Sequence, residues 1–401
     1  MIMFRRVGRF KLAIWQIMGI GAIAVIVTFQ ISPLDALRSV NLDVILFLFG
    51  VFVIGQALDS SGYLSSVSER IFRKAGSVDM LVVSVLFLMG LSSAFLMNDT
   101  VAIIGTPVVL LLSKANRISP KLMLLALAFS ITIGSVMSPI GNPQNLLIAL
   151  EGTVENPFVE FAGYLFIPTI INLLTAYLLL RLFFRDEFRK ELRPLKPEPL
   201  KDRRLALLSR VSLSIMFFLI LVKIILVFLD IGGDIRLTYI ALISMAPILL
   251  LHRSRFQLVR SIDWHTLLFF VSMFILMGAV WNTGFFQDIL ESSFSSLTSI
   301  PMVFLVSILA SQLISNVPLV ALYMPMLAEL GVSSRELIAL AAGSTIAGNL
   351  TLIGAASNVI IVQNAEKRTG DTLTFFDFIR IGFPLTVLNS LVYLVFFMVL
   401  S

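Results

Sequence analysis

The sequence predicts an all-α integral membrane protein, and three observations support this prediction. The chain of 401 residues is 58% hydrophobic and only 13% charged, with a mean hydropathy of +0.98, whereas about a quarter of the residues in a soluble chain are charged. Apolar stretches that are long enough to cross a bilayer recur from end to end. Four of the apolar segments contain polar or proline-rich interruptions, in matching order in the two halves of the chain.

About nine spanning helices are expected, two of them broken near mid-membrane, together with two re-entrant helical hairpins. The seven uninterrupted helices are expected at 12–31, 42–58, 161–184, 208–229, 237–252, 264–281 and 379–400. The first of these follows a basic N-terminal segment, is long for the apolar part of a signal peptide, and has no small-residue cleavage site after it. We therefore interpret it as a membrane helix with a cytoplasmic N-terminus.

A first hairpin is expected at 80–113, where Asn98-Asp99-Thr100 interrupts an apolar run. Its second arm, 101–113, would be only about 20 Å long as a helix, which is too short to cross a hydrocarbon core of about 30 Å. Basic residues flank both ends of the run. Because Lys and Arg collect on the cytoplasmic side of a membrane, we expect the hairpin to enter from the cytoplasm.

The next apolar segment, 121–150, would be about 45 Å long as one straight helix, which is too long for a single crossing. Pro139, Gly141 and Pro143 interrupt it within the sequence SPIGNPQN (138–145), and proline breaks a helix. Non-helical backbone at membrane depth survives only where it is buried in protein or lines a cavity. We therefore expect a broken helix with a functional interruption.

The second half of the chain shows the same pattern. An apolar run at 300–330 is interrupted by Ser315-Asn316-Val317-Pro318, and its acidic flanks favour a hairpin that enters from outside. A second broken helix is expected at 334–366, with interruptions around Gly348-Asn349 and at 354–358.

Three pairs of segments align between the halves: 46–62 with 268–284, 93–107 with 311–325, and 131–148 with 344–361. Their separations are 222, 218 and 213 residues, and matched positions include Asn98 with Asn316 and Asn145 with Asn358. Since the first hairpin is expected to enter from one side and the second from the other, we predict two inverted-topology repeats. Inverted repeats with broken helices at matching positions indicate a transporter site at the repeat interface.

The resulting organisation has a first repeat at 1–184, a basic cytoplasmic linker with a connecting helix at 185–236, and a second repeat at 237–401. The net charge of +6 is interpreted as a topology signal in a multi-pass protein of the cell (plasma or inner) membrane, not as a nucleic-acid site. The C-terminus is then external. The absence of cysteine excludes disulfides and thiolate metal sites.

The candidate substrate and ion site consists of residues at the four interruptions. These are Asn98, Asp99, Thr100, Gly141, Asn142 and Asn145 in the first half, and Ser315, Asn316, Gly354, Ser357 and Asn358 in the second. Helix N-termini at the interruptions present unpaired N–H groups, which favour an anionic or strongly polar substrate. Their oxygen atoms suit Na⁺, with Asn98, Asp99, Gly141, Asn145, Asn316, Gly354 and Asn358 as candidates. The alternative is that these residues only cap broken helices.

Asp99 is the one acidic residue that we expect deep in the membrane. Intramembrane carboxylates are costly and are functional candidates by default. Asp99 could bind a coupling cation or exchange a proton, and the simpler interpretation is a helix cap alone.

These motifs resemble the ion transporter superfamily, in particular the ArsB/NhaD-type permeases and the related divalent-anion:sodium symporters. The similar elements are NDT (98–100) with TP (106–107), SPIGNPQN, SQLISNVP (311–318) and GNLTLIGAASN (348–358). The resemblance implies a scaffold domain, a transport domain, elevator-type alternating access and a homodimer, with substrate and Na⁺ at the hairpin tips and unwound loops. The tips differ from the Ser-Asn-Thr signature of the dicarboxylate branch, and Asp99 looks more like the arsenite-permease branch, where the resemblance implies proton coupling.

The sequence therefore predicts a secondary permease, without a cofactor other than Na⁺ as a possible coupling ion, that moves a small anion coupled to Na⁺ or H⁺. A Na⁺/H⁺ antiporter or an arsenite-type efflux permease that uses Asp99 is the alternative. A membrane-embedded enzyme would need a nucleophile–base pair or a cluster of acids. One deep Asp and no deep His argue against that reading, and the matched broken helices argue against a channel.

Overall fold

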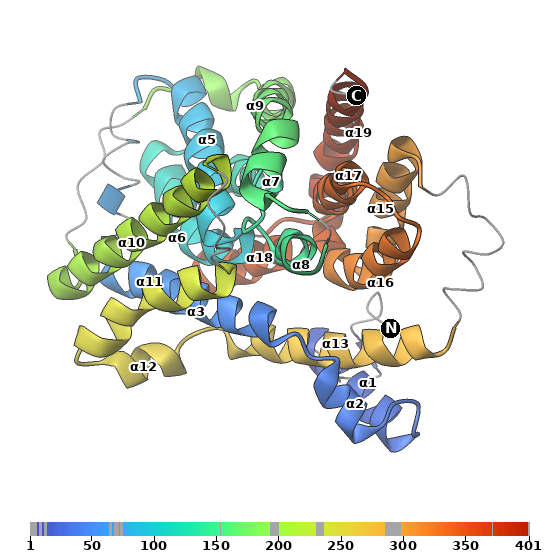
Figure 1. Cartoon of the computed structure of the whole chain (residues 1–401). Helices are drawn as coiled ribbons and strands as arrows, with labels where there is room; N and C mark the ends of the chain where they lie inside the picture. The colour runs from blue at the N-terminus through green and yellow to red at the C-terminus, as the bar shows by residue number, and fades with distance from the viewer. Residues whose placement is uncertain are drawn as a thin grey trace.

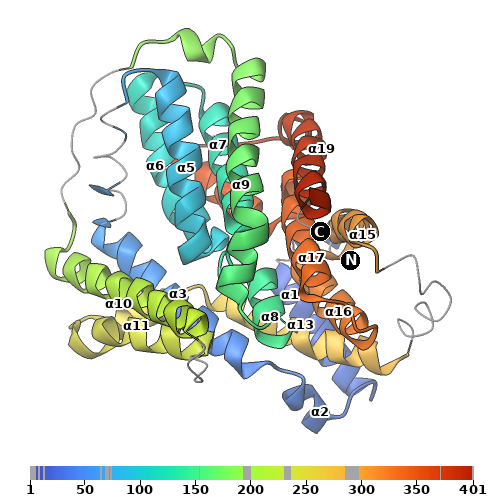
Figure 2. The same cartoon turned by 45° about the horizontal axis from the view of Figure 1, so that its top comes forward.

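The computed structural model describes residues 6–7, 10–11, 14–63, 66–67, 72, 75–152, 154–192, 200–229, 236–284, 298–370 and 372–399. Apart from a two-residue ribbon of β1 (Arg6–Val7) and β2 (Phe10–Lys11), the regular structure of these residues is helical. The predicted all-helical class is confirmed. The helices form two groups, which Figures 1 and 2 show from two directions.

The first group occupies the lower side of Figure 1 and takes helices from both halves of the chain. Helix α3 packs against α10, α11 and α13, and α1 packs along α13. The members are α1 (Ile14–Val27), α2 (Pro33–Arg38), α3 (Leu42–Ser61), α10 (Arg203–Phe228), α11 (Leu237–Leu251), α12 (Arg255–Arg260) and α13 (Trp264–Asn282).

The second group holds all four interrupted segments. From the first half it contains α5 (Val78–Leu96), α6 (Asn98–Asn116), α7 (Pro120–Val136), α8 (Pro143–Glu151), α9 (Pro157–Phe183) and the short η1 (Glu187–Arg189). From the second half it contains α15 (Ile300–Ile314), α16 (Asn316–Glu329), α17 (Ser334–Ile346), η2 (Ala347–Asn349), η3 (Leu352–Gly354), α18 (Ala356–Thr369) and α19 (Phe375–Val399). The halves interlock, because α7 packs on α17, α6 on α18 and α9 on α19.

Six described helices are long and apolar enough to cross a bilayer: α3, α5, α9, α10, α13 and α19. Two segments expected to span, 12–31 and 237–252, form shorter helices of 14 and 15 residues. The first is shorter than predicted because the chain leaves the helix after Val27 and turns at Phe29, which has a φ of 56°. The predicted number of nine spans stays a prediction.

Each hairpin turns at a single residue, Met97 between α5 and α6 and Ser315 between α15 and α16. Both turn residues have positive φ, 66° and 76°, which is uncommon outside glycine. The predicted tip residues Asn98, Asp99 and Thr100 therefore form the first turn of α6, and this arm is longer than the expected 101–113. With 19 residues α6 measures about 28 Å, so shortness alone does not make this segment a hairpin.

Polar caps and close backbone contacts fix these helix ends. Ser77 accepts a hydrogen bond from the N–H of Met80 at the start of α5, and Ser333 forms a capping box with Glu336 at the start of α17. At the α5–α7 crossing, a Cβ added to Gly134 would lie 2.2 Å from the carbonyl oxygen of Gly90. Only glycine therefore permits this approach.

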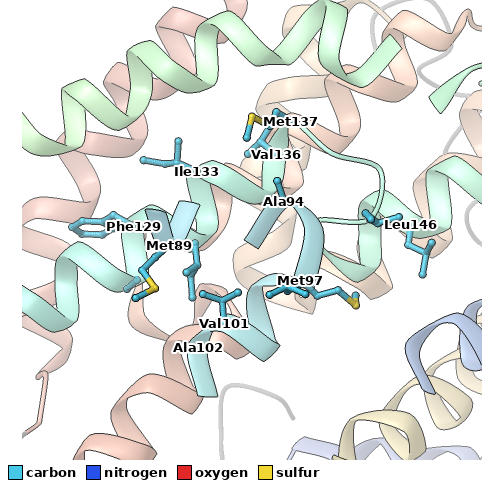
Figure 3. Close-up of a cluster of buried hydrophobic side chains, with 14 of the residues drawn as sticks. Met89, Ala94, Met97, Val101, Ala102, Phe129, Ile133, Val136, Met137 and Leu146 are labelled. Atoms are coloured by element: carbon cyan, nitrogen blue, oxygen red, sulfur yellow. The ribbon is translucent and has the colours of Figure 1, made fainter. Parts of the chain in front are cut away.

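An apolar cluster packs the tip of the first hairpin against α7 and α8. Met97, the turn residue, is completely buried. The labelled side chains of this cluster in Figure 3 are Met89, Ala94, Met97, Val101, Ala102, Phe129, Ile133, Val136, Met137 and Leu146. The polar residues of the first interruption therefore lie beside a densely packed apolar cluster.

Candidate functional site

The first break is the non-helical segment 137–142 between α7 and α8. Asn142 caps α8 by accepting a hydrogen bond from the N–H of Asn145 at 2.9 Å, and Pro143 follows at the position where a missing N–H is tolerated. The side-chain amide of Asn142 also donates to the hydroxyl of Ser135 at 3.2 Å and to that of Thr345 at 3.1 Å. Thr345 belongs to α17, so this cap links the two halves.

Asn145 holds the carbonyl groups that the first break leaves without helical partners. Its amide nitrogen donates to the carbonyl oxygens of Ser135 at 3.2 Å, Val136 at 3.2 Å and Ser138 at 3.0 Å. Its amide oxygen accepts from the hydroxyl of Thr345 at 3.3 Å. Asn145 is completely buried, and it closes the first break with hydrogen bonds inside the protein.

The first hairpin tip lies against this break. The backbone N–H of Asn98 donates to the carbonyl oxygen of Gly141 at 2.9 Å, and the side-chain oxygen of Asn98 accepts from the N–H of Asp99 at 2.9 Å. Asp99 and Thr100 are buried beside them. Within the described residues, the carboxylate of Asp99 has no hydrogen-bond donor or ion-pair partner. The structure thus joins Asn98 to Gly141, next to the cap formed by Asn142 and Asn145. Asp99 and Thr100 follow on the first turn of α6, and Thr100 faces Gly55 on α3.

The second break, 347–355, comprises η2, η3 and the residues between and after them. Asn358 donates its side-chain amide to the carbonyl oxygens of Gly348 at 2.8 Å and Thr351 at 3.4 Å. These acceptors precede Asn358 by the same numbers of residues as Ser135 and Ser138 precede Asn145. The match supports the predicted internal repeat.

The second hairpin tip lies beside the second break. A Cβ placed on Gly348 would lie 3.8 Å from the side-chain nitrogen of Asn316. Gln312, one turn before the tip, donates to the carbonyl oxygen of Ala347 at 2.8 Å and accepts from the hydroxyl of Thr351 at 2.9 Å. Gly354 packs against the same two side chains. Ser315 provides the turn but, being half-buried, is the most exposed of the predicted residues in this half.

Several buried oxygen atoms in the second break, in the hairpin beside it and on α7 have no partner within the described residues. They are the amide oxygens of Asn316, Asn349 and Asn358 and the hydroxyls of Thr132, Ser311 and Ser357. Unpartnered buried polar atoms are destabilising and call for an explanation. These atoms could coordinate a hard cation or receive hydrogen bonds from a polar ligand. The described residues hold no cluster of three His, Asp or Glu side chains, so any cation here would meet mainly neutral oxygen.

Sequence reasoning missed Thr132, Gln144, Gln312, Thr345 and Asn349. Gln144, Gln312 and Asn349 lie within the quoted motifs, and their position was a usable signal. The two threonines lie inside apolar helices, where a single polar residue gives no indication of which break it faces.

The chain is similar in sequence to several known proteins. The chain is 29% identical over 394 residues to an uncharacterized transporter of Mycobacterium tuberculosis, covering 92% of this chain and 89% of the relative. It is 28% identical over 438 residues to a silicon efflux transporter of Oryza sativa, with coverage of 92% and 89%. It is 26% identical over 450 residues to the human P protein, covering 88% of this chain and 53% of the relative.

Two solved structures share the fold. The YdaH transporter of Alcanivorax borkumensis superimposes with a TM-score of 0.57 at 16% identity, over 89% of this chain and 84% of that chain. MtrF of Neisseria gonorrhoeae superimposes with a TM-score of 0.55 at 13% identity, over 94% and 83%. The citrate transporter family matches residues 1–336, which confirms the predicted superfamily. The chain is a multi-pass membrane transporter that belongs to the citrate transporter family.

Proposed function

We propose that this transporter is a secondary permease that moves a small anion, coupled to Na⁺ or H⁺, by elevator-type alternating access. The observation that carries the proposal is the junction of four helix N-termini, those of α6, α8, α16 and α18. The start of α6 is bonded to the first break through Asn98, and the start of α8 to α17 through Thr345. Asn316 at the start of α16 adjoins the second break, and Asn358 in the first turn of α18 is bonded to it. Helix N-termini favour a nearby anion through their partial positive charge, and here the N–H groups of Asn98, Asp99 and Asn145 are already bonded within the protein.

Carboxylates are the first substrates to test, because the matching family is described as a citrate transporter family. Small oxyanions and silicon species come second, because one relative is a silicon efflux transporter. Both classes are compatible with the chemistry of the junction, since backbone N–H groups and amide side chains recognise oxygen without requiring one molecular shape.

The grouping of the helices supports the elevator step. The first hairpin faces α3 of the other group, where a Cβ on Gly55 would lie 2.4 Å from the methyl group of Thr100. A small residue at this contact leaves the surface of α3 smooth where the hairpin tip meets it. In the proposal, the group of α3, α10, α11 and α13 is the scaffold, and the hairpins and broken helices move against it in a homodimer with a cytoplasmic N-terminus and an external C-terminus.

Asp99 favours a second candidate, a Na⁺/H⁺ antiporter or arsenite-type efflux permease. Its carboxylate is buried, with no partner within the described residues. An isolated buried carboxylate is unfavourable, so it either carries a proton or holds a cation.

Flux in proteoliposomes tests the proposal. Citrate, other carboxylates, oxyanions and silicic acid are offered with a Na⁺ gradient, a pH gradient or neither, to wild type, Asp99→Asn and Asp43→Asn. Asp43 is the matched control because it lies at the start of α3, away from both breaks, with its carboxylate bonded to the hydroxyl of Thr238. Anion flux driven by either gradient supports the permease. If no anion moves, Na⁺ exchanges for H⁺, and Asp99→Asn but not Asp43→Asn abolishes this exchange, then the protein is a Na⁺/H⁺ antiporter and the permease proposal is wrong.

A further inference from the structure

Each half of the chain has an amide and a carboxylate side chain at matched positions, one in each helix group. In the first half these are Asn41, directly before α3, and Glu151, the last residue of α8. The alignment separations of 222 and 213 residues place Asp263, directly before α13, and Asn364, on α18, at the equivalent positions. The amide and the carboxylate have thus exchanged places between the halves.

Local geometry supports the equivalence of the two pairs. Asn41 caps α3 by accepting a hydrogen bond from the N–H of Val44 at 3.0 Å, and Asp263 caps α13 by accepting from the N–H of Thr266 at 3.1 Å. Helices α8 and α18 begin at positions that are themselves 213 residues apart. The two pairs therefore occupy the same places in the two repeats.

Only the first pair is bonded in this conformation. The side-chain amide of Asn41 donates to the carboxylate of Glu151, and α8 packs on α3. The carboxylate of Asp263 instead accepts from its own helix, from the N–H of Thr266 and, at 2.6 Å, from its hydroxyl. Within the described residues, no hydrogen bond joins Asp263 to Asn364. One matched pair is therefore closed and the other is open.

The two pairs belong to opposite membrane surfaces. With the proposed cytoplasmic N-terminus, the chain reaches the outer side before Asn41, whereas Asp263 follows the arginine-rich segment 253–260 on the inner side. Because the repeats are inverted, a contact that the first half makes in one end state is expected in the second half in the other end state. The closed and the open pair thus correspond to two different end states.

We propose that these pairs are alternating latches of the transport cycle. Asn41 with Glu151 holds the present conformation on the outer side, and Asp263 with Asn364 holds the opposite conformation on the inner side. This inference rests on the proposed elevator step, and it assigns the four residues as positioning residues that hold one helix group against the other.

The chemistry of both pairs suits this role. A hydrogen bond from an amide N–H to a carboxylate is stronger than one between neutral groups. An ionised carboxylate has about four lone-pair sites, so Asp263 can accept from Asn364 without releasing the N–H that it caps. Since each bond exists in one end state only, its loss shifts the equilibrium toward the other state.

Cross-linking in isolated membranes tests the proposal, because the chain has no cysteine and an engineered pair reports alone. An outer-pair variant carries Asn41→Cys with Glu151→Cys, and an inner-pair variant carries Asp263→Cys with Asn364→Cys. Bifunctional thiol reagents of increasing length are applied, and mass spectrometry measures the initial rate of linking. The outer pair should link with the shortest reagents, and the inner pair more slowly, in proportion to the population of the opposite state.

Glu151→Ala is then added to the inner-pair variant. Loss of the outer latch should raise the initial rate of linking at the inner pair about fivefold. Glu151→Gln still accepts from Asn41 and should change the rate by less than about twofold. Glu155→Ala is the matched control, because Glu155 is an exposed carboxylate four residues later and should have no effect.

A second control is a contact inside one group. Lys121 and Asp377 form an ion pair at 2.8 Å between α7 and α19, and cysteines at these positions should link at the same rate with and without Glu151→Ala. An inner pair that never links while the outer pair does would overturn the inner latch. An inner-pair rate that Glu151→Ala leaves unchanged would overturn the outer latch. The permease proposal fails separately, if no anion moves in proteoliposomes, and that result does not depend on the cross-linking rates.

Discussion

In the first break, Asn145 holds the carbonyls of Ser135 and Ser138, and in the second break Asn358 holds those of Gly348 and Thr351 at the same spacing. The amide oxygens of the two asparagines differ. That of Asn145 accepts from Thr345, whereas that of Asn358 has no partner within the described residues. The hydrogen bonds that both asparagines make hold the unwound carbonyl groups of the two broken helices. The bond from Thr345 to Asn145 has no counterpart at Asn358, so we call the first break closed and the second open.

The hairpins differ in the same sense. Ser93 on α5 donates to the carbonyl oxygen of Ile131 at 2.8 Å, so the first hairpin is bonded to α7. The equivalent Ser311 on α15 has a buried hydroxyl without a partner within the described residues. The second hairpin is held instead by the side chain of Gln312. The hairpin of the first half is therefore bonded more firmly to its neighbouring helix than that of the second half.

The largest difference between the breaks should come from their matched glycines. A Cβ on Gly141 would lie 2.2 Å from the carbonyl oxygen of Ser135, whereas one on Gly354 would lie 2.9 Å from that of Ala347, with Gln312 and Thr351 next. Gly141→Ala should lower the free energy of unfolding by about 3 kcal/mol or more, and Gly354→Ala by about 1 kcal/mol. Thermal melting with size-exclusion chromatography measures both, and equal losses would contradict a closed first break.

The matched asparagines give the next largest difference. Asn145→Ala removes the donor to three buried carbonyls and the acceptor of Thr345 and should lower stability by about 3–5 kcal/mol, because each unsatisfied buried group is destabilising. Asn358→Ala removes two hydrogen bonds and should lower it by about 1–3 kcal/mol. Denaturant unfolding of the purified variants measures the order, and a reversed order would show that Asn358 carries the heavier structural role.

The helical class, the position of the first break and the pairing of Asn145 with Asn358 could be predicted from the sequence. Two prolines and a glycine within five residues, Pro139, Gly141 and Pro143, strongly disfavour a continuous helix, so the position of the first break followed from the sequence. Single prolines gave no such signal, since they lie inside α6, α9, α11, α16 and α19. The alignment of the two halves paired Asn145 with Asn358. The helical class followed from hydropathy. Local rules were enough for these features because each depends on neighbours in the chain.

Features that depend on tertiary contacts were not accessible. Thr132 and Thr345 acquire their roles only because α7 crosses α17, and neither has a local signal in an apolar helix. The tip was expected at 98–100 but the turn lies at Met97, so the second arm begins three residues earlier than predicted. A non-glycine residue with positive φ is disfavoured locally, and burial tolerates it here. The shortness of α1 was missed for a similar reason, a turn at Phe29.

The matched hairpin serines should show effects of opposite sign. Ser93→Ala removes a hydrogen bond to Ile131 and should lower stability by about 1 kcal/mol. Ser311→Ala removes a buried hydroxyl without a partner and should leave stability unchanged or raise it by about 0.5 kcal/mol. Melting curves of the two variants without Na⁺ check this. A clear destabilisation by Ser311→Ala would mean that Ser311 does hold a partner and that the second hairpin is as firmly bonded as the first.

The smallest effect on stability should come from substitution of Asp202, which lies outside both breaks and serves as the control for the variants above. The N–H of Leu205, hydrogen-bonded to its carboxylate at 2.9 Å, lowers the pKa of Asp202 from its ordinary value of 3.8. A lowered pKa means that the charge stabilises the folded state above pH 3.8 and that this contribution is lost as the pH falls through the lowered value.

Asp202→Asn keeps the cap and removes the charge, and solvent screens this partly exposed carboxylate. Its deficit should therefore be only about 0.5 kcal/mol at pH 7, and should begin to shrink as the pH falls below 3.8. Melting at pH 7, 5 and 3.5, with and without Na⁺, checks this. Because Asp202 contacts neither break, its Na⁺ response should equal that of wild type at each pH. A changed Na⁺ response would show that the breaks are coupled to the 185–236 segment, and the difference between the two breaks would then not depend on their own residues alone.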